Sequence, residues 1–200
     1  MLRAAVIRLR ALACLPLLLA ASCLEVPGTG LLGEYAMRDV ATADGTHLEQ
    51  GCTPSGVEIC FDAIDNNCNG VIDEGCGVHT GTLQFIIAWD AAEADVNLEV
   101  TDANGEVAQA QEATSGGLYK DRDCPRDGQC FGQNVENVYL TNAEPEKGRY
   151  KVSVKLDKLG GASAPVRVRL GVRVGQRSYG MTFELSPGEK TAEKTFEFTL

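Results

Sequence analysis

The chain has 200 residues, of which 18 are basic and 28 are acidic, and its formal net charge is −10. An acidic surface repels nucleic acids and anionic headgroups, so we expect no nucleic-acid partner, whereas divalent cations suit such a surface. The length allows one principal domain with short appended segments.

The N-terminal segment has the pattern of an export signal. Residues 1–10 contain three arginines and no acid, and residues 11–21 are rich in leucine and alanine. The apolar stretch is shorter than a membrane-spanning helix needs. We therefore predict a signal peptide over residues 1–22, with a short amphipathic helix as the alternative.

This segment ends in residues 19–23, Leu-Ala-Ala-Ser-Cys, and resembles a bacterial lipobox, with Ala20 where that pattern has leucine. The resemblance implies cleavage before Cys23, lipidation of its sulfur and anchoring in the cell envelope; Leu24 favours the outer membrane. Simple secretion is the alternative. Cleavage would remove three basic and no acidic residues, which leaves a net charge of −13. Residues 23–51 show no periodicity and are expected to form a lipidated tether.

Four cysteines recur at intervals of eight residues and define a segment over residues 52–76. With Cys14 removed and Cys23 lipidated, six cysteines remain in an oxidising compartment, which indicates disulfides. They are Cys52, Cys60, Cys68, Cys76, Cys124 and Cys130. The first four allow three connectivities, and we expect the last two to pair. A zinc site on four cysteines is the rival, although no Cys-x-x-Cys occurs.

The run from Asp65 to Glu74 reproduces the ligand spacing of an EF-hand loop: Asp at position 1, Asn at 3 and 5, Gly at 6 and Asp at 9. Position 12 is Cys76 instead of a bidentate Glu, so we expect weak Ca²⁺ binding, with a dissociation constant on the order of 10⁻⁴ to 10⁻³ M. An Asx-rich turn held by disulfides is the alternative. The predicted ligands are Asp65, Asn67, Asn69, the Val71 carbonyl, Asp73 and Glu74.

Three short patterns in this segment, Glu58–Cys60, Asp65–Gly70 and Ile72–Cys76, together resemble the MopE-type metal-binding motif of bacterial secreted proteins. The resemblance implies a metal site, and it introduces copper as the alternative metal. His47, His79 and Trp89 could then contribute, although Trp89 at a strand end is expected in the core.

Residues 77–200 show the two-residue alternation of β-strands, with almost no helical periodicity. The predicted strands span 82–89, 96–101, 135–140, 150–156, 166–174, 178–185 and 195–199. We therefore predict a mainly β protein, in which a jelly-roll-like antiparallel β-sandwich follows a small disulfide-stapled calcium-loop module. The expected core includes Phe85, Trp89, Tyr150, Phe183 and Phe196.

A succession of short motifs over 83–200 resembles YfaP-like domains. The motifs are Ile86–Trp89, Ala94–Leu98, Asn104-Gly105, Gly116–Leu118, Asp121–Asp123, Val135–Val138 and Gly148–Tyr150. The resemblance implies a jelly-roll-like sandwich related to accessory domains of secreted proteases.

Acidic and amide side chains near strand ends predict a second possible metal site in the sandwich. Alternate residues of an extended segment point to the same side, so paired oxygens can face one cation. Ordinary solvated loop acids, with Arg122 pairing locally, are the alternative. The candidate ligands are Asp95, Asn97, Asp121, Asp123 and Glu136.

No nucleophile elbow, HExxH motif, phosphate loop or dinucleotide fingerprint occurs, and only His47 and His79 could titrate near neutral pH. We therefore expect a non-enzymatic, calcium-binding lipoprotein of the cell envelope. It would present the sandwich to a glycan, a peptide or an envelope protein. The alternatives are a copper-binding or copper-acquisition protein of MopE type, or an accessory domain of a secreted hydrolase system.

Overall fold

The computed structural model describes residues 41–42, 48–50, 52–125, 130, 132–141 and 144–200. These residues fall in one compact unit, Leu31–Leu200. The predicted signal peptide, the lipidation site Cys23, most of the tether and His47 lie outside the described residues. Within the described ranges, no helix is long and apolar enough to cross a membrane.

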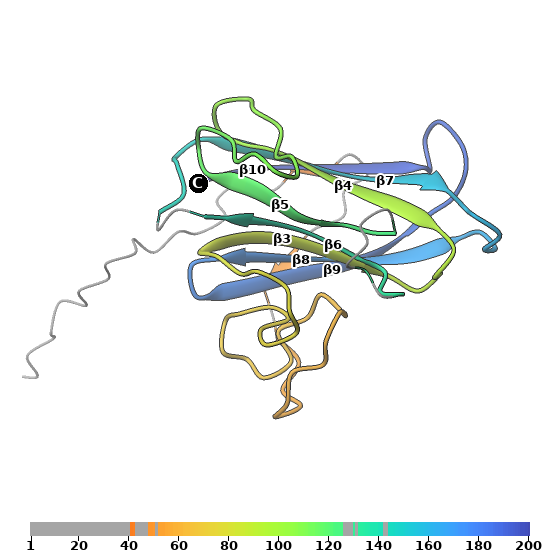
Figure 1. Cartoon of the computed structure of the whole chain (residues 1–200), viewed down its shortest axis with the longest axis horizontal. Helices are drawn as coiled ribbons and strands as arrows, with labels where there is room; N and C mark the ends of the chain where they lie inside the picture. The colour runs from red at the N-terminus through yellow and green to blue at the C-terminus, as the bar shows by residue number, and fades with distance from the viewer. Residues whose placement is uncertain (1–40, 43–47, 51, 126–129, 131, 142–143) are drawn as a thin grey trace, which may run out of the picture. The chain divides into compact units, whose positions relative to one another are not determined.

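The regular structure of the described residues consists of strands that form two antiparallel sheets (Figure 1). One sheet has the order β1-β10-β7-β4, and the other has the order β2-β9-β8-β3-β6-β5. The predicted mainly β, antiparallel two-sheet class is therefore confirmed. The strands are β1 (Ala41–Thr42), β2 (Glu49–Gln50), β3 (Leu83–Trp89), β4 (Asp95–Thr101), β5 (Leu118–Asp123), β6 (Val135–Leu140), β7 (Arg149–Lys158), β8 (Val166–Val174), β9 (Arg177–Leu185) and β10 (Glu193–Thr199).

Aromatic side chains fill the space between the sheets. Phe85 packs against Phe198 with ring centroids 5.5 Å apart, and Tyr150 stacks on the same ring at 5.6 Å. The Trp89 indole N–H donates to the Ala94 carbonyl at 3.0 Å, which satisfies its polar atom inside the core. All five aromatic residues predicted for the core are buried.

All residues of the central strand β3 are buried, so both of its faces are covered. In a two-sheet sandwich the outer face of a strand is usually exposed to solvent. Its outward-facing Ile86 is fully buried because the cysteine-rich segment packs there. Gly171 of β8 lies opposite Ile86, and a Cβ atom at Gly171 would approach the Ala63 carbonyl oxygen to 2.6 Å and Ile72 Cδ1 to 3.1 Å. The absent side chain at Gly171 therefore lets the segment lie directly on the sheet.

We expect Gly171→Ala to destabilise the fold by about 1–3 kcal/mol, because the added methyl group overpacks this contact against backbone. Gly180→Ala is a matched control: Gly180 lies opposite Gly171 in β9, and its Cβ would come within 2.7 Å of the end of the flexible Arg169 side chain but only within 3.6 Å of backbone, at the Leu170 carbonyl oxygen. Urea unfolding of both variants measures the difference. Equal losses would show that the cysteine-rich segment does not depend on Gly171.

Candidate metal centre

Two interleaved disulfides hold the cysteine-rich segment. Cys52 bonds to Cys68 and Cys60 bonds to Cys76, each across 16 positions. Of the three connectivities that the sequence left open, the structure has the one in which the loops overlap. The third disulfide joins Cys124 and Cys130, as predicted. All six sulfurs are engaged, so the zinc site on four cysteine thiolates does not fit this structure.

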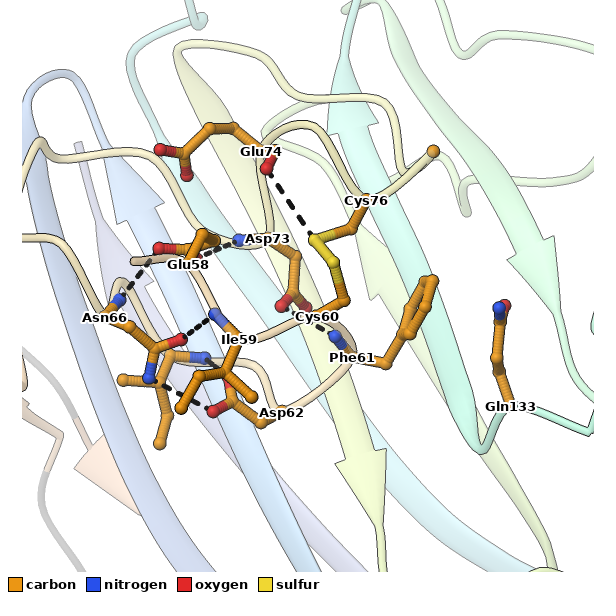
Figure 2. The surroundings of a disulfide bond; sticks show 12 residues. Glu58, Ile59, Cys60, Phe61, Asp62, Asn66, Asp73, Glu74, Cys76 and Gln133 are labelled. Atoms are coloured by element: carbon orange, nitrogen blue, oxygen red, sulfur yellow. Dashed lines mark hydrogen bonds between the residues drawn. A yellow bond between two sulfur atoms is a disulfide. The ribbon is translucent and has the colours of Figure 1, made fainter. Parts of the chain in front are cut away.

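Glu58 organises the backbone of the segment. Its Oε2 accepts N–H groups from Asn66 at 3.0 Å and Asn67 at 3.3 Å, while its Oε1 accepts the N–H of Asp73 at 2.8 Å (Figure 2). Burial raises the pKa of this carboxyl group above its usual range, and the N–H groups oppose that shift. The Glu-x-Cys pattern was the sequence signal of this residue, although its role as a backbone acceptor was not predicted.

The Asp73 carboxylate also faces backbone. Its two oxygens accept the N–H groups of Phe61 at 2.9 Å and Ala63 at 3.3 Å, residues whose φ angles are 66° and 58°. Burial, together with the nearby charge of Asp62, raises the pKa of Asp73 to about 7. Asp73 therefore stabilises a left-handed turn, and its predicted role as a ligand stays a prediction.

Asp65 ties the loop to the sandwich. Its Oδ1 accepts the Asn69 N–H at 3.0 Å, and its Oδ2 accepts the Gly70 N–H at 2.9 Å and the Ser178 hydroxyl at 2.9 Å. Gly70 has a φ of 83°, and a Cβ there would come within 2.5 Å of the Gln176 carbonyl oxygen. The predicted turn at Gly70 is present, but no sequence signal pointed to Ser178, 113 residues away.

The side chains of Asn67, Asn69 and Glu74 converge. Both amide Nδ2 atoms lie 2.5 Å from Glu74 Oε1, while Glu74 Oε2 is buried and has no hydrogen-bond partner among the described residues. Figure 2 shows the Glu74 carboxylate directed away from the Cys60–Cys76 disulfide. The two amides therefore share one carboxylate oxygen of Glu74, and the other oxygen has no hydrogen-bond partner among the described residues.

The amide oxygens lie in the same loop. Asn67 Oδ1 accepts the Asn69 N–H at 3.0 Å, the same N–H that Asp65 Oδ1 accepts, and Asn69 Oδ1 accepts the Val71 N–H at 2.8 Å. Each oxygen retains a second lone pair after accepting one N–H. Four of the predicted ligands therefore present side-chain oxygens within one disulfide-held turn. They are Asp65, Asn67, Asn69 and Glu74.

This donor set fits a hard cation. Within the described ranges, no three side chains of His, Cys, Asp and Glu lie close enough to hold a metal ion, so any site here depends on amide and carbonyl oxygens. Calcium takes such oxygens, whereas copper and zinc prefer imidazole and thiolate. A bound cation would give Glu74 Oε2 the partner that it does not have among the described residues.

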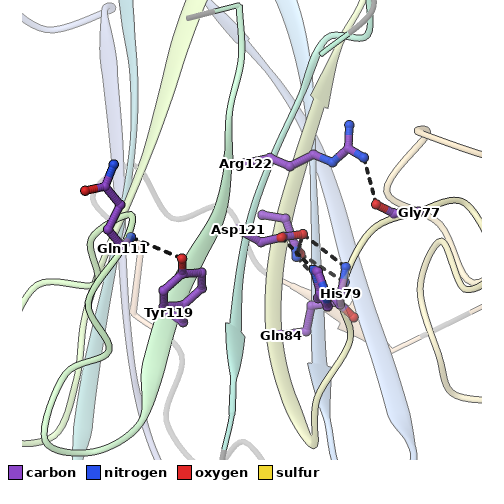
Figure 3. A network of polar contacts seen from close by, with 8 residues as sticks. Gly77, His79, Gln84, Gln111, Tyr119, Asp121 and Arg122 are labelled. Atoms are coloured by element: carbon purple, nitrogen blue, oxygen red, sulfur yellow. Dashed lines mark hydrogen bonds and ion pairs between the residues drawn. The ribbon is translucent and has the colours of Figure 1, made fainter. Parts of the chain in front are cut away.

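Asp121, predicted for the second metal site, binds His79 instead. Its Oδ2 accepts the His79 N–H at 3.0 Å and its Oδ1 lies 2.7 Å from His79 Nδ1 (Figure 3). The imidazole also stacks on Tyr139, with the ring centroids 5.3 Å apart. Arg122 donates to the Gly77 carbonyl at 2.7 Å, so it does not simply pair with its neighbouring acids.

Asp123 and Glu136, from the same predicted site, surround an ammonium group. Lys120 Nζ lies 2.8 Å from Asp123 and 2.9 Å from Glu136. A register shift between Lys120 and Arg122 separates Asp121 from this pair along β5. Asp95 and Asn97 remain on β4, the first buried and the second half-buried. The structure therefore places Asp121 apart from Asp123 and Glu136, and the second metal site in the sandwich stays a prediction.

Comparison with known proteins supports the cysteine-rich segment as a metal-binding motif. Residues 52–74 match the Cu-binding MopE family model, described as a "putative metal-binding motif". The chain has no significant match among curated proteins or among solved structures. The MopE-type resemblance is confirmed at the level of this motif. The YfaP-like resemblance and the lipoprotein signal stay predictions.

Proposed function

We propose that this protein is a non-enzymatic, lipid-anchored protein of the cell envelope that binds Ca²⁺ in its disulfide-held loop. The β-sandwich would serve as the interaction module for a glycan, a peptide or an envelope protein. The observation that carries the calcium proposal is the convergence of Asn67 and Asn69 on Glu74, whose second oxygen has no hydrogen-bond partner within the described ranges. The proposed lipid anchor depends on the lipobox resemblance. Mass spectrometry of the N-terminal peptide of the exported protein tests it, because that peptide should begin at a lipidated Cys23.

The residues that would hold the ion are Asn67, Asn69 and Glu74, with Asp65 Oδ1 and the Val71 carbonyl from the predicted set. Bound Ca²⁺ would supply a positive charge that the unpartnered Glu74 Oε2 can coordinate. Burial lowers the pKa of the Arg173 guanidinium, and the charges of Asp65 and Glu74 oppose that shift. That guanidinium opposes a second positive charge, which agrees with weak binding.

Copper is the second candidate, and the name of the matching family favours it. The described histidine, His79, is held by Asp121. The six disulfide-bonded cysteines offer no thiolate. These contacts favour Ca²⁺ over copper, since copper in either oxidation state binds nitrogen and sulfur ligands more readily than neutral oxygens.

We expect Glu74→Gln to weaken Ca²⁺ binding at this loop at least tenfold while the protein remains folded, because Glu74 is partly exposed and its side chain accepts, among the described residues, only from the Asn67 and Asn69 amides. Isothermal titration with Ca²⁺ and with Cu²⁺ measures the effect. Asp65→Ala is less informative, since Asp65 also holds the turn and Ser178.

Glu189→Gln, in an exposed turn, is the matched control for the change of charge. It should titrate like the unmodified protein. Calcium affinity that is unchanged in Glu74→Gln, or copper binding without calcium binding, would overturn the proposal.

A further inference from the structure

Another unsatisfied carboxylate, that of Asp102, lies directly after the C-terminal end of strand β4. Asp102 is the first residue after β4, which ends at Thr101, and it is 3% exposed. Its Oδ1 accepts the N–H groups of Asn104 and Glu106, both at 2.9 Å. Its Oδ2 is buried and has no hydrogen-bond partner in the described part of the chain. A buried anionic oxygen without a partner is costly, so this atom needs a positive or donor group.

A second carboxylate oxygen faces the same space. A Cβ atom built on Gly116 would lie 2.9 Å from Asp102 Oδ2 and 3.3 Å from Glu146 Oε2. These two oxygens, 44 positions apart in sequence, therefore border the small volume that Gly116 leaves open. Asn104 Nδ2 lies 2.5 Å from the same Glu146 oxygen and 3.2 Å from the Ser115 hydroxyl.

The surrounding contacts position Glu146 and supply no counter-charge. The Tyr150 hydroxyl donates to the Glu146 carbonyl at 2.8 Å, which fixes the backbone before β7. Glu106 accepts the Ser115 N–H, which adds a third acid at the rim. Among the ion pairs of the described residues, none involves Asp102, Glu106 or Glu146.

We propose that Asp102, Glu146 and the Asn104 amide oxygen form a Ca²⁺ site that is separate from the loop of residues 65–74. The ion is coordinated by Asp102 Oδ2, which otherwise has no hydrogen-bond partner among the described residues, and it offsets the repulsion between the Asp102 and Glu146 carboxylates. The asparagine amide turns its oxygen, instead of its nitrogen, toward the ion, since the two are exchanged by rotation. This site shares no residue with the five oxygens predicted from the sequence for a second cation.

Three variants test the site by different means. Asp102→Asn places an amide where the unpartnered oxygen stands, so the variant should melt in chelator no lower than the unmodified protein. Glu146→Gln removes a charge from an exposed residue. Gly116→Ala changes no charge and fills the space with a methyl group. Each should weaken binding at this site at least tenfold and reduce the rise in melting temperature that millimolar Ca²⁺ produces.

Calcium stoichiometry by isothermal titration separates this site from the loop. We expect two ions in the unmodified protein, one in Asp102→Asn, one in Glu74→Gln and none in the double variant; Glu189→Gln should still bind two. Two ions retained in Asp102→Asn and Glu146→Gln, or all binding lost in Glu74→Gln alone, would overturn this inference and leave the loop proposal standing. Binding lost only in Asp102→Asn would overturn the loop proposal instead.

Discussion

Glu136→Ala should destabilise the protein by about 3–5 kcal/mol, because it removes a buried acceptor that serves both the Lys120 ammonium and a backbone N–H of the other sheet. Glu136 is fully buried in β6, and its Oε2 accepts both the Lys120 ammonium at 2.9 Å and the Leu98 N–H at 2.6 Å. Leu98 belongs to β4, the edge strand of the other sheet, so this carboxylate joins the two sheets. Alanine would leave the N–H and most of the ammonium without an acceptor.

Urea unfolding measures the loss, and the exposed pair of Arg149 and Glu197 provides the control. These groups lie 3.6 Å apart with side chains 74% and 45% exposed, so Glu197→Ala should cost about 0.2–1 kcal/mol. Losses of similar size in both variants would show that Glu136 does not join the sheets.

Glu136 also predicts a pH dependence of stability. Burial raises its pKa to about 9, against the opposing charge of Lys120, whereas the ordinary value is 4.5. The folded protein therefore holds this proton more tightly than the unfolded chain does. That contribution to stability is complete below about pH 4.5 and is lost as the pH rises through 9. Glu136→Gln should flatten the profile across this range.

Replacing Cys60 and Cys76 together by serine should cost about 3 kcal/mol, the loop-closure entropy of a 16-residue separation. The disulfide crosses the turn that carries Asp73 and Glu74, so the variant should also lose Ca²⁺ binding at the loop. Hydrogen exchange of the amides in residues 52–76, followed beside those of β3 and β8, reports where protection is lost.

The matched control is the double serine variant of Cys124 and Cys130, which closes only six positions and should cost about 2 kcal/mol. It should leave Ca²⁺ binding at the loop unchanged. Retained calcium affinity in the Cys60 and Cys76 variant would show that the disulfide does not organise the metal site.

The strand pattern of the sandwich was largely predictable, because alternating side chains in segments such as 166–174 face core and solvent in turn. The exception is β5 (Leu118–Asp123), which is absent from the predicted strands. Only Leu118 and Arg122 in its Leu-Tyr-Lys-Asp-Arg-Asp sequence are buried, so apolar alternation is missing, and backbone pairing with β6 makes it a strand.

In the candidate site, the ligand spacing correctly predicted the turn at Gly70 and the proximity of Asn67 to Asn69. Both features depend on residues only a few positions apart. The direction of Asp73 does not, because its acceptor role for Phe61 and Ala63 depends on how the disulfides cross. In the sandwich, the register shift in β5 separates Asp121 from Asp123, and no residue pattern announced it.

The burial of β3 on its outer face could not be read from one strand alone. Its continuous apolar run was consistent with two covered faces, but the covering element is a cysteine-rich segment with few apolar residues. Ala63 and Ile72 are its buried contacts, and Gly171 makes room for them. Such complementarity joins positions about 100 residues apart and leaves no short-range signal.

The most direct measurement of the central claim is the anomalous diffraction signal of the oxidised protein crystallised with Ca²⁺ and, in parallel, with Cu²⁺. We predict a calcium peak in contact with the side chains of Asn67, Asn69 and Glu74. A loop without a calcium peak at saturating Ca²⁺, or a copper peak on His79 as the only metal in the crystals, would contradict it.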